Sequence, residues 1–138
     1  MKKVLFVCIG NSCRSQMAEG FARAHGAGVV NPMSAGLYPA ASVSRLTREV
    51  MADRHIDIDG QFPKAFGEVP VETFDIVVNM SGQPLPAQLK PRVLEWAVDD
   101  PMGFDKPVYE EAASEIERLV RDLIDRVRSG GQLSSRAG

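Results

Sequence analysis

The first thirty residues alternate between apolar runs and glycine-containing breaks. Residues 3–8 are predicted to form a strand, because every position after Lys3 is β-branched, aromatic or otherwise apolar until the chain reaches Gly10. A run that is apolar at successive positions predicts a central strand of a parallel sheet, because both faces of such a strand are buried. Residues 14–25 carry apolar side chains at helical spacing and stop at Gly26 and Gly28, which predicts a helix. The chain therefore opens as strand, loop and helix.

The later apolar runs predict three more strands and two more helices. The expected strands cover residues 29–34, 74–80 and 92–98, and the expected helices cover residues 43–55 and 107–128. Pro32 lies inside the second strand, so an edge position or a bulge is expected there. Pro107 suits the first turn of the last helix. Strands alternating with helices predict an α/β fold, with a four-stranded parallel sheet flanked by helices on both faces.

The length of the chain fits one domain. Its 138 residues are 44% apolar, enough to bury a single core. Residues 1–129 are expected to form this domain. Residues 130–138 are polar and rich in glycine and serine, so a flexible C-terminal tail is expected.

Charge and hydropathy exclude several classes of partner. A formal charge of −2 offers no basic surface for nucleic acid. No stretch approaches the roughly 20 apolar residues of a membrane span, and no signal peptide is recognised, so a cytoplasmic protein is expected. Two cysteines do not make a disulfide framework, and both are expected to be thiols at rest.

The residues with chemical potential are concentrated where the first strand meets the first helix. Residues 8–15 read Cys-Ile-Gly-Asn-Ser-Cys-Arg-Ser. A loop at the carboxyl end of a strand can point successive N–H groups inward, and the following helix adds its own unpaired N–H groups. The sequence therefore predicts a phosphate-binding loop after strand one. The residues expected to bind the substrate are Ile9, Gly10, Asn11, Ser12, Cys13 and Ser15.

Cys8 is the predicted nucleophile. Thiols near helix N-termini and cations have pKa values of about 3.5–7.5, against ~8.5 for a free thiol, so Cys8 is expected to be a thiolate at neutral pH. Arg14 offers a planar fork for two oxyanion oxygens, and Ser15 can donate a hydrogen bond to the sulfur. Cys13 is either a small buried residue at the start of the helix or a redox partner.

An acid is expected in the loop after strand four. Asp99-Asp100-Pro101 would lie at the same end of the sheet as Cys8 if that strand is parallel. Asp100 is interpreted as the general acid for the leaving oxygen, with Asp99 as the fallback. No His or Cys spacing resembles a metal site, and no cofactor is expected. Trp96 and Phe104 are interpreted as core residues.

These motifs together resemble the low-molecular-weight protein tyrosine phosphatases and the arsenate reductases built on the same fold. The resemblance covers residues 4–127 and includes the 8–15 motif and Asp100-Pro101. It implies that Cys8 attacks phosphorus, that Arg14 holds the equatorial oxygens, and that Asp100 protonates the leaving group and then activates water. It also implies that Cys13 can form a reversible disulfide with Cys8.

Three functions remain open at this stage. A phosphatase acting on phosphomonoesters through a phosphocysteine is placed first, because the residues for its chemistry are complete. An arsenate reductase comes next. Residues 79–83 read Asn-Met-Ser-Gly-Gln and lack the relay cysteines of thioredoxin-coupled enzymes, so it would need an external thiol system of the glutathione, mycothiol or glutaredoxin type, or a Cys8–Cys13 disulfide. The third is a protein that binds an oxyanion without catalysis.

Overall fold

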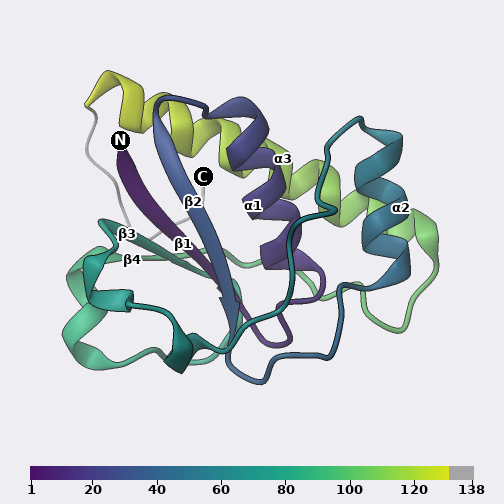
Figure 1. Cartoon of the computed structure of the whole chain (residues 1–138), viewed down its shortest axis with the longest axis horizontal. Coiled ribbons are helices and arrows are strands. Elements are labelled where there is room, and N and C mark those ends of the chain that lie inside the picture. Colours follow the sequence, from purple (N-terminus) through teal and green to yellow (C-terminus); the bar gives the residue numbers. More distant parts are fainter. Residues whose placement is uncertain (131–138) are drawn as a thin grey trace.

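The computed structural model describes residues 1–130 and shows a four-stranded parallel sheet (Figure 1). The expected tail beyond Gly130 lies outside the described residues. The strands are β1 (Lys2–Cys8), β2 (Val30–Gly36), β3 (Ile76–Asn79) and β4 (Val93–Glu95), arranged in the order β2-β1-β3-β4. The predicted fold class is confirmed. No helix in the described part of the chain is long and apolar enough to cross a membrane.

Strand β1 lies inside the sheet and pairs with two neighbours. Val4 lies opposite Pro32 of β2 and opposite Ile76 of β3. Strand β2 pairs with β1 alone among the strands, so the edge position expected from Pro32 is confirmed. A proline is tolerated on such a strand because its missing N–H can face away from the ladder.

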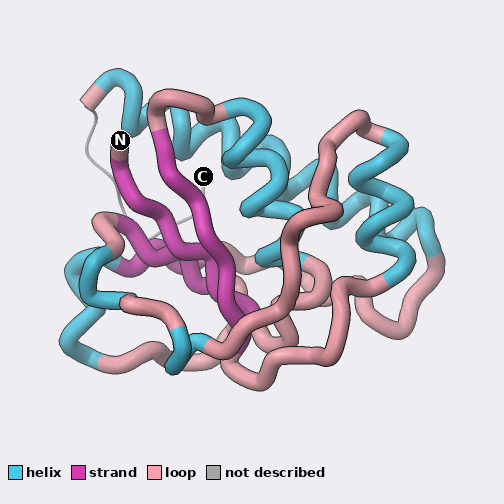
Figure 2. Tube along the Cα trace, in the orientation of Figure 1, coloured by secondary structure: helices cyan, strands magenta, loops and turns pink. Residues whose placement is uncertain are grey.

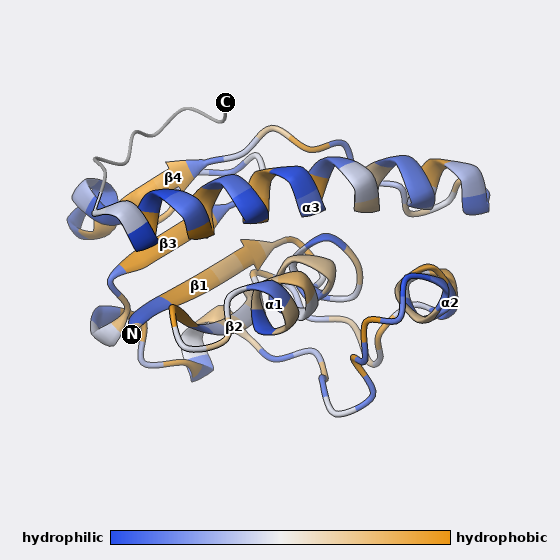
Figure 3. Ribbon diagram, turned by 90° about the horizontal axis from the view of Figure 1, so that it is seen from above, coloured by the Kyte–Doolittle hydropathy of each residue, from blue (hydrophilic) through white to orange (hydrophobic). Residues whose placement is uncertain are grey.

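Three α-helices share one side of the sheet. They are α1 (Arg14–His25), α2 (Arg45–Asp53) and α3 (Lys106–Ser129), and Figure 3 shows α3 running along the sheet beside α1. Val4, Phe6 and Cys8 point from β1 into a core that they share with these helices. The side chains of alternate residues of β1 point to the same face, which fixes Cys8 on the side of α1.

Short 3-10 helices cover the opposite face. They are η1 (Phe66–Glu68), η2 (Val71–Thr73) and η3 (Ala87–Arg92). Leu5 and Val7 of β1 pack on that face against apolar side chains from η1, η2 and the loop before η3. Helical segments therefore cover both faces as predicted, but the second layer consists of short 3-10 helices and loops. Figure 2 shows that long loops also gather at the carboxyl ends of the strands.

Some element ends differ from the sequence expectations. Strand β3 ends at Asn79, whose Oδ1 accepts the N–H of Ser81 at 3.0 Å and begins a turn. Strand β4 is shorter than expected because Glu95 lies opposite Asn79, the last residue of its partner. Phe104 was wrongly interpreted as a core residue, since it is 62% exposed, whereas Trp96 is buried as expected.

Strand β2 extends to Gly36, two residues beyond its predicted end. A side chain at this position would place its Cβ 2.9 Å from both the N atom of Asn11 and the O atom of Ile9. The loop after β1 therefore lies directly against the backbone of β2. This contact needs glycine and brings the end of β2 to the phosphate-binding loop.

Candidate active site

The loop after β1 turns its carbonyl oxygens outward. The oxygens of Ile9, Gly10 and Ser12 accept hydrogen bonds from backbone N–H groups of the segment 38–44, at 2.8, 2.9 and 3.0 Å. Within the described structure, the N–H groups of residues 10–13 have no protein acceptor. Because the N–H and C=O of a peptide unit point in opposite directions, these donors face the side away from that segment. They form a concave set of N–H donors that suits an anion.

Asn11 holds the middle of this loop from behind. Its φ of 51° lies in the left-handed region, which asparagine tolerates better than most residues. Its carbonyl oxygen accepts from Gln16 Nε2 at 2.9 Å, and its side-chain Oδ1 accepts from the backbone N–H of Lys64 at 2.9 Å. Its Nδ2 donates to Ser15 Oγ at 2.7 Å. Every polar group of the Asn11 side chain is therefore engaged.

Cys8 lies at the end of β1 with its sulfur against Ser15. The distance from Cys8 Sγ to Ser15 Oγ is 2.9 Å, and both residues are buried. Ser15 Oγ already accepts from Asn11 Nδ2, so its own hydrogen is free to point at the sulfur. A hydrogen bond donated to a thiolate favours the charged form.

Arg14 begins α1 and extends beneath the other strand ends. Its Nη1 donates to the carbonyl oxygens of Met80 at 2.7 Å and Val98 at 2.9 Å. Its Nη2 lies 3.6 Å from Asp100 Oδ2. These contacts, with 8% of the side chain exposed, fix the guanidinium in one orientation. An oxyanion arriving at the loop would meet a charge that is already positioned.

A cavity of about 240 Å³ opens above the loop. It brings together the predicted nucleophile, arginine and acid, and its lining consists of Cys8, Ile9, Gly10, Ser12, Cys13, Arg14, Ala40, Asp100 and Met102. The side chains of Asn11 and Ser15, which were expected to bind the substrate, do not line the cavity. They support the loop from behind, while the backbone N–H of Asn11 remains in the donor set.

Two lining residues were not found from the sequence. Ala40 is a small residue without reactive groups, and nothing in its pattern marks it. Met102 follows Asp100 by two residues, and that proximity could have identified it. The hydroxyl of Tyr109 donates to Met102 Sδ at 3.1 Å, which ties this side of the cavity to α3.

Asp100 lies in a more open position than the other two residues. Its side chain is 45% exposed, and its Oδ1 accepts the N–H of Met102 at 3.0 Å. Asp99, the alternative acid, is exposed and does not line the cavity. The geometry therefore favours Asp100 over Asp99 as a proton donor to a group bound above Cys8.

Cys13 is the second thiol of the loop and occupies the N-cap position of α1 without a side-chain capping hydrogen bond. Burial raises the pKa of its thiol to about 12, although a hydrogen bond with Thr47 works in the opposite direction. The thiol is therefore protonated at neutral pH. Within residues 1–130, no group of three or more His, Cys, Asp or Glu side chains is placed to hold a metal ion.

Comparisons with known proteins cover nearly the whole chain. A model of the family described as low molecular weight phosphotyrosine protein phosphatase matches residues 3–133. A glutaredoxin arsenate reductase from Synechocystis sp. is 34% identical over 131 residues, covering 92% of this chain and 99% of the relative.

Solved structures give the same result. An arsenate reductase in the phosphate binding state has a TM-score of 0.87 and 34% identity, covering 92% of this chain and 99% of the other. A low molecular weight protein tyrosine phosphatase from T. tengcongensis has a TM-score of 0.78 and 30% identity, covering 91% and 99%. Arsenate reductases and phosphatases therefore both share this fold at full length. With the family model matching from residue 3 onward, the chain belongs to the low molecular weight phosphotyrosine protein phosphatase family of enzymes.

Proposed function

We propose that this enzyme reduces arsenate to arsenite, with Cys8 as the nucleophile and an external thiol as the reductant. The observation that carries the proposal is the small cavity above Cys8. Its volume is about 240 Å³ and its rim contains Ala40 and Met102, below the roughly 300–1,000 Å³ of typical organic-ligand pockets. A bare tetrahedral oxyanion suits this space. The full-length similarity to relatives named arsenate reductases supports the same choice.

The first step assigns one role to each residue of the site. The Cys8 thiolate attacks arsenic, and a bond between sulfur and arsenic forms as one oxygen departs. The N–H groups of residues 10–13 and the guanidinium of Arg14 hold the remaining oxygens. Asp100 gives a proton to the departing oxygen, which leaves as water.

The second step transfers the electrons. A thiolate attacks Cys8 Sγ and forms a mixed disulfide, while the electron pair of the sulfur–arsenic bond stays on arsenic, which is released as arsenite. A second thiol attacks the mixed disulfide and frees Cys8. Overall, one arsenic acid and two thiols give one arsenious acid, one disulfide and one water.

The thiols come from outside the chain in this proposal. The sequence contains two cysteines, and both are buried. The nucleophile in disulfide exchange is the thiolate, and the raised pKa of about 12 keeps Cys13 protonated. This weighs against a Cys8–Cys13 disulfide as the normal intermediate. A low-molecular-weight thiol with a glutaredoxin-type protein supplies both equivalents, in line with the name of the Synechocystis relative.

The test measures arsenite release by purified, reduced protein. Arsenate is supplied with glutathione and glutaredoxin, with a mycothiol system, or with thioredoxin and its reductase. We expect turnover with one of the first two systems and a loss of more than about 10⁴-fold in Cys8→Ser, because a serine hydroxyl is not ionised at neutral pH. Failure of all three systems would exclude the proposal.

Phosphatase activity is the second candidate, and the position of Asp100 favours it. Its carboxyl is accessible and lies 3.6 Å from Arg14 Nη2, so it can protonate an ester oxygen and later activate water. The same preparation is assayed with an aryl phosphate in the absence of thiol donors. Hydrolysis that exceeds arsenate reduction in kcat/KM would make the enzyme a phosphatase. Tight oxyanion binding with neither turnover would leave only the binding function.

A further inference from the structure

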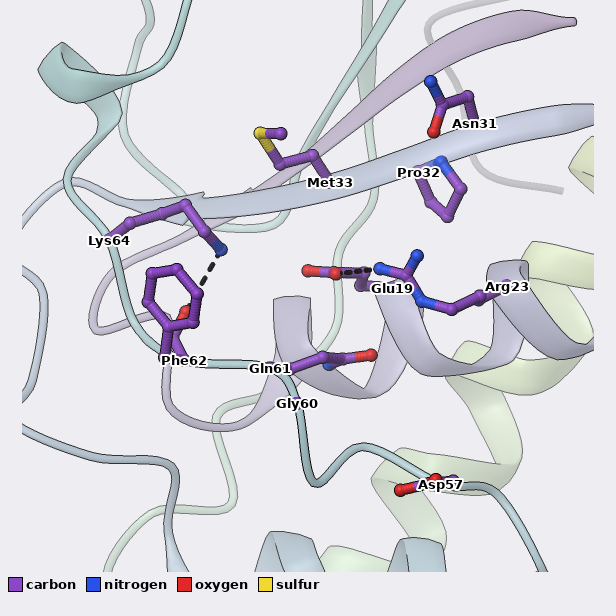
Figure 4. A pocket seen from close by; sticks show the side chains of 10 residues that line it. All are labelled: Glu19, Arg23, Asn31, Pro32, Met33, Asp57, Gly60, Gln61, Phe62 and Lys64. Atoms are coloured by element: carbon purple, nitrogen blue, oxygen red, sulfur yellow. Dashed lines mark hydrogen bonds and ion pairs between the residues drawn. The ribbon is translucent and has the colours of Figure 1, made fainter.

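A cavity larger than the one above Cys8 lies on the side of α1 and β2. It has a volume of about 560 Å³, and its walls come from α1, β2 and the segment 57–64. Figure 4 shows the Lys64 ammonium and the Glu19 carboxylate pointing toward the same space. This cavity shares no lining residue with the one above Cys8. Any influence of this cavity on Cys8 therefore has to act through the residues that line it.

The side chain of Lys64 anchors this wall to β2. Its Nζ donates to the carbonyl oxygen of Ser34 at 3.0 Å and to that of Phe62 at 3.1 Å. Burial lowers the pKa of the Lys64 ammonium, and the charge of Arg23 adds to that effect, while the Glu19 carboxylate opposes it. Glu19 is itself buried, accepts from Ser34 Oγ at 2.6 Å and pairs with Arg23. The ammonium is thus held between a strand and a loop.

The backbone of Lys64 makes the link to the nucleophile. Its N–H donates to Asn11 Oδ1 at 2.9 Å, and its carbonyl oxygen accepts from the N–H of Gly36 at 2.9 Å. Accepting at Oδ1 fixes which end of the Asn11 amide faces Ser15. Asn11 Nδ2 then donates to Ser15 Oγ, which lies 2.9 Å from the Cys8 sulfur. Three consecutive hydrogen bonds join Lys64 to the thiol.

A second connection runs from the same segment through α1. Gln61 Nε2 donates to the Gln16 carbonyl oxygen at 3.0 Å and to Gln16 Oε1 at 2.8 Å. Gln16 Nε2 donates to the carbonyl oxygen of Asn11 at 2.9 Å. The segment 61–64 therefore holds Asn11 at both its backbone and its side chain, and it does so at the residue with the left-handed φ.

We propose that Lys64 is a positioning residue for Cys8: its ammonium anchors the segment 61–64 to β2, and this segment orients the Asn11 amide so that the Ser15 hydroxyl donates to the thiolate. Lys64 contacts neither the sulfur nor the cavity above it. The proposal rests on the proposed role of Cys8 as a thiolate nucleophile. In this proposal, the larger cavity holds the Lys64 ammonium.

Thiol alkylation tests the proposal without requiring turnover. In a Cys13→Ser background Cys8 is the single thiol, and its rate of reaction with iodoacetamide is followed against pH. Lys64→Met keeps the aliphatic stem and removes the ammonium. We expect the midpoint of alkylation to rise by about one pH unit, which is the scale of one hydrogen bond to a charged group. The affinity for inorganic phosphate, measured by calorimetry, should fall about tenfold with it.

Lys3→Ala is the matched control. Lys3 also donates a hydrogen bond, to Thr73 Oγ1 at 2.7 Å. Its ammonium lies over the Phe74 ring, as that of Lys64 lies over the Phe62 ring. It stands at the opposite end of β1 from the loop, so its loss should leave the alkylation midpoint unchanged. In Lys64→Ala, ethylamine added at millimolar concentration should restore the midpoint in part, because the space left by the side chain opens into the larger cavity.

The outcomes separate this role from a purely structural one. If Lys64→Met and Lys64→Ala lower the melting temperature but keep the parent midpoint and phosphate affinity, Lys64 only stabilises the fold and the proposal is wrong. If the parent protein itself shows an unperturbed alkylation midpoint near that of free cysteine, the thiolate role of Cys8 fails instead. Failure of arsenate reduction alone affects the proposed function and leaves this test unchanged.

Discussion

The loop that carries Cys8 is buried and hydrogen-bonded from behind, whereas the loop that carries Asp100 is open to solvent. In the first loop, Asn11 forms hydrogen bonds with three residues, Ser15, Gln16 and Lys64. Asp100, in contrast, is 45% exposed and its Oδ1 accepts a single N–H, from Met102 in the same turn. An ion pair between Arg14 Nη2 and Asp100 Oδ2 joins the two regions.

This contrast matches the two tasks proposed for the site. Binding an oxyanion and stabilising a thiolate require donors that are already in place, because reorganisation during the reaction would cost part of their benefit. A proton donor must reach a leaving oxygen and afterwards admit water or a thiol. A rigid loop suits the first task and an accessible one suits the second. Substitutions in the two loops should therefore have effects that differ in kind as well as in size.

Among variants that keep the Cys8 nucleophile, the largest effect on arsenate reduction is expected for Arg14→Lys. One ammonium cannot replace a guanidinium that donates to two carbonyl oxygens and still faces the cavity. We expect kcat/KM for arsenate to fall by on the order of 100-fold, as for the loss of one oxyanion donor elsewhere. Arg45→Lys, an exposed position on α2, is the control and should keep its activity. A loss of only a few-fold in Arg14→Lys would show that the loop N–H groups suffice.

Asp100→Asn should separate the two chemistries. We expect hydrolysis of an aryl phosphate to fall by about 100-fold, because the leaving oxygen loses its acid. Arsenate reduction should fall by less than about tenfold, because the departing oxygen can already carry a proton. Asp99→Asn serves as the control and should change neither rate. If Asp99→Asn were the more damaging variant, the assignment of the acid would be reversed.

Two glycines test the packing of the loops directly. In Gly36→Ala, the new Cβ would lie 2.9 Å from backbone atoms of Asn11 and Ile9, so we expect a loss of about 3 kcal/mol in the free energy of unfolding. Gly103, beside the Asp100 loop, has a φ of +90° and open space at its Cβ position. Gly103→Ala should cost about 1 kcal/mol through backbone strain alone. Urea unfolding of both variants measures the difference, and equal losses would contradict it.

The smallest effect is expected for Cys13→Ser. With an external thiol as reductant, arsenite release should change by less than about threefold, because a protonated, buried thiol takes no part in the exchange. The measurement is the rate of arsenite release under saturating glutathione and glutaredoxin. A loss comparable to that of Cys8→Ser would instead establish Cys13 as the resolving thiol.

The sequence was sufficient where the local pattern decides the structure. Helix α1 spans the predicted residues, and Asn11 adopts a positive φ, a conformation that asparagine tolerates. Cys8 and Arg14 come together because a single strand–loop–helix unit holds both of them. Asp100 could be placed near them because parallel strands end at one edge of the sheet.

The sequence was insufficient where contacts between distant segments determine the structure. The ends of β3 and β4 depend on how far the two strands pair, which no local pattern contains. Lys64 acts through contacts with Asn11 and Ser34, which are far from it in the sequence. A lysine between a proline and an alanine reads as a solvated surface residue. The same holds for Met102, whose place on the rim depends on Tyr109 of α3.

Within residues 1–130, no other strand pairs with the outer edge of β2, and an open strand edge is where sheets of separate molecules join. Pro32 lies in the middle of this strand and carries no N–H, so a second strand added there would lack a hydrogen bond at its centre. At the end of the strand nearest the loop, Gly36 forms an isolated bridge with Ala65. Together these features protect the protein against edge-to-edge aggregation, and replacing Pro32 with valine is expected to lower the concentration at which it precipitates.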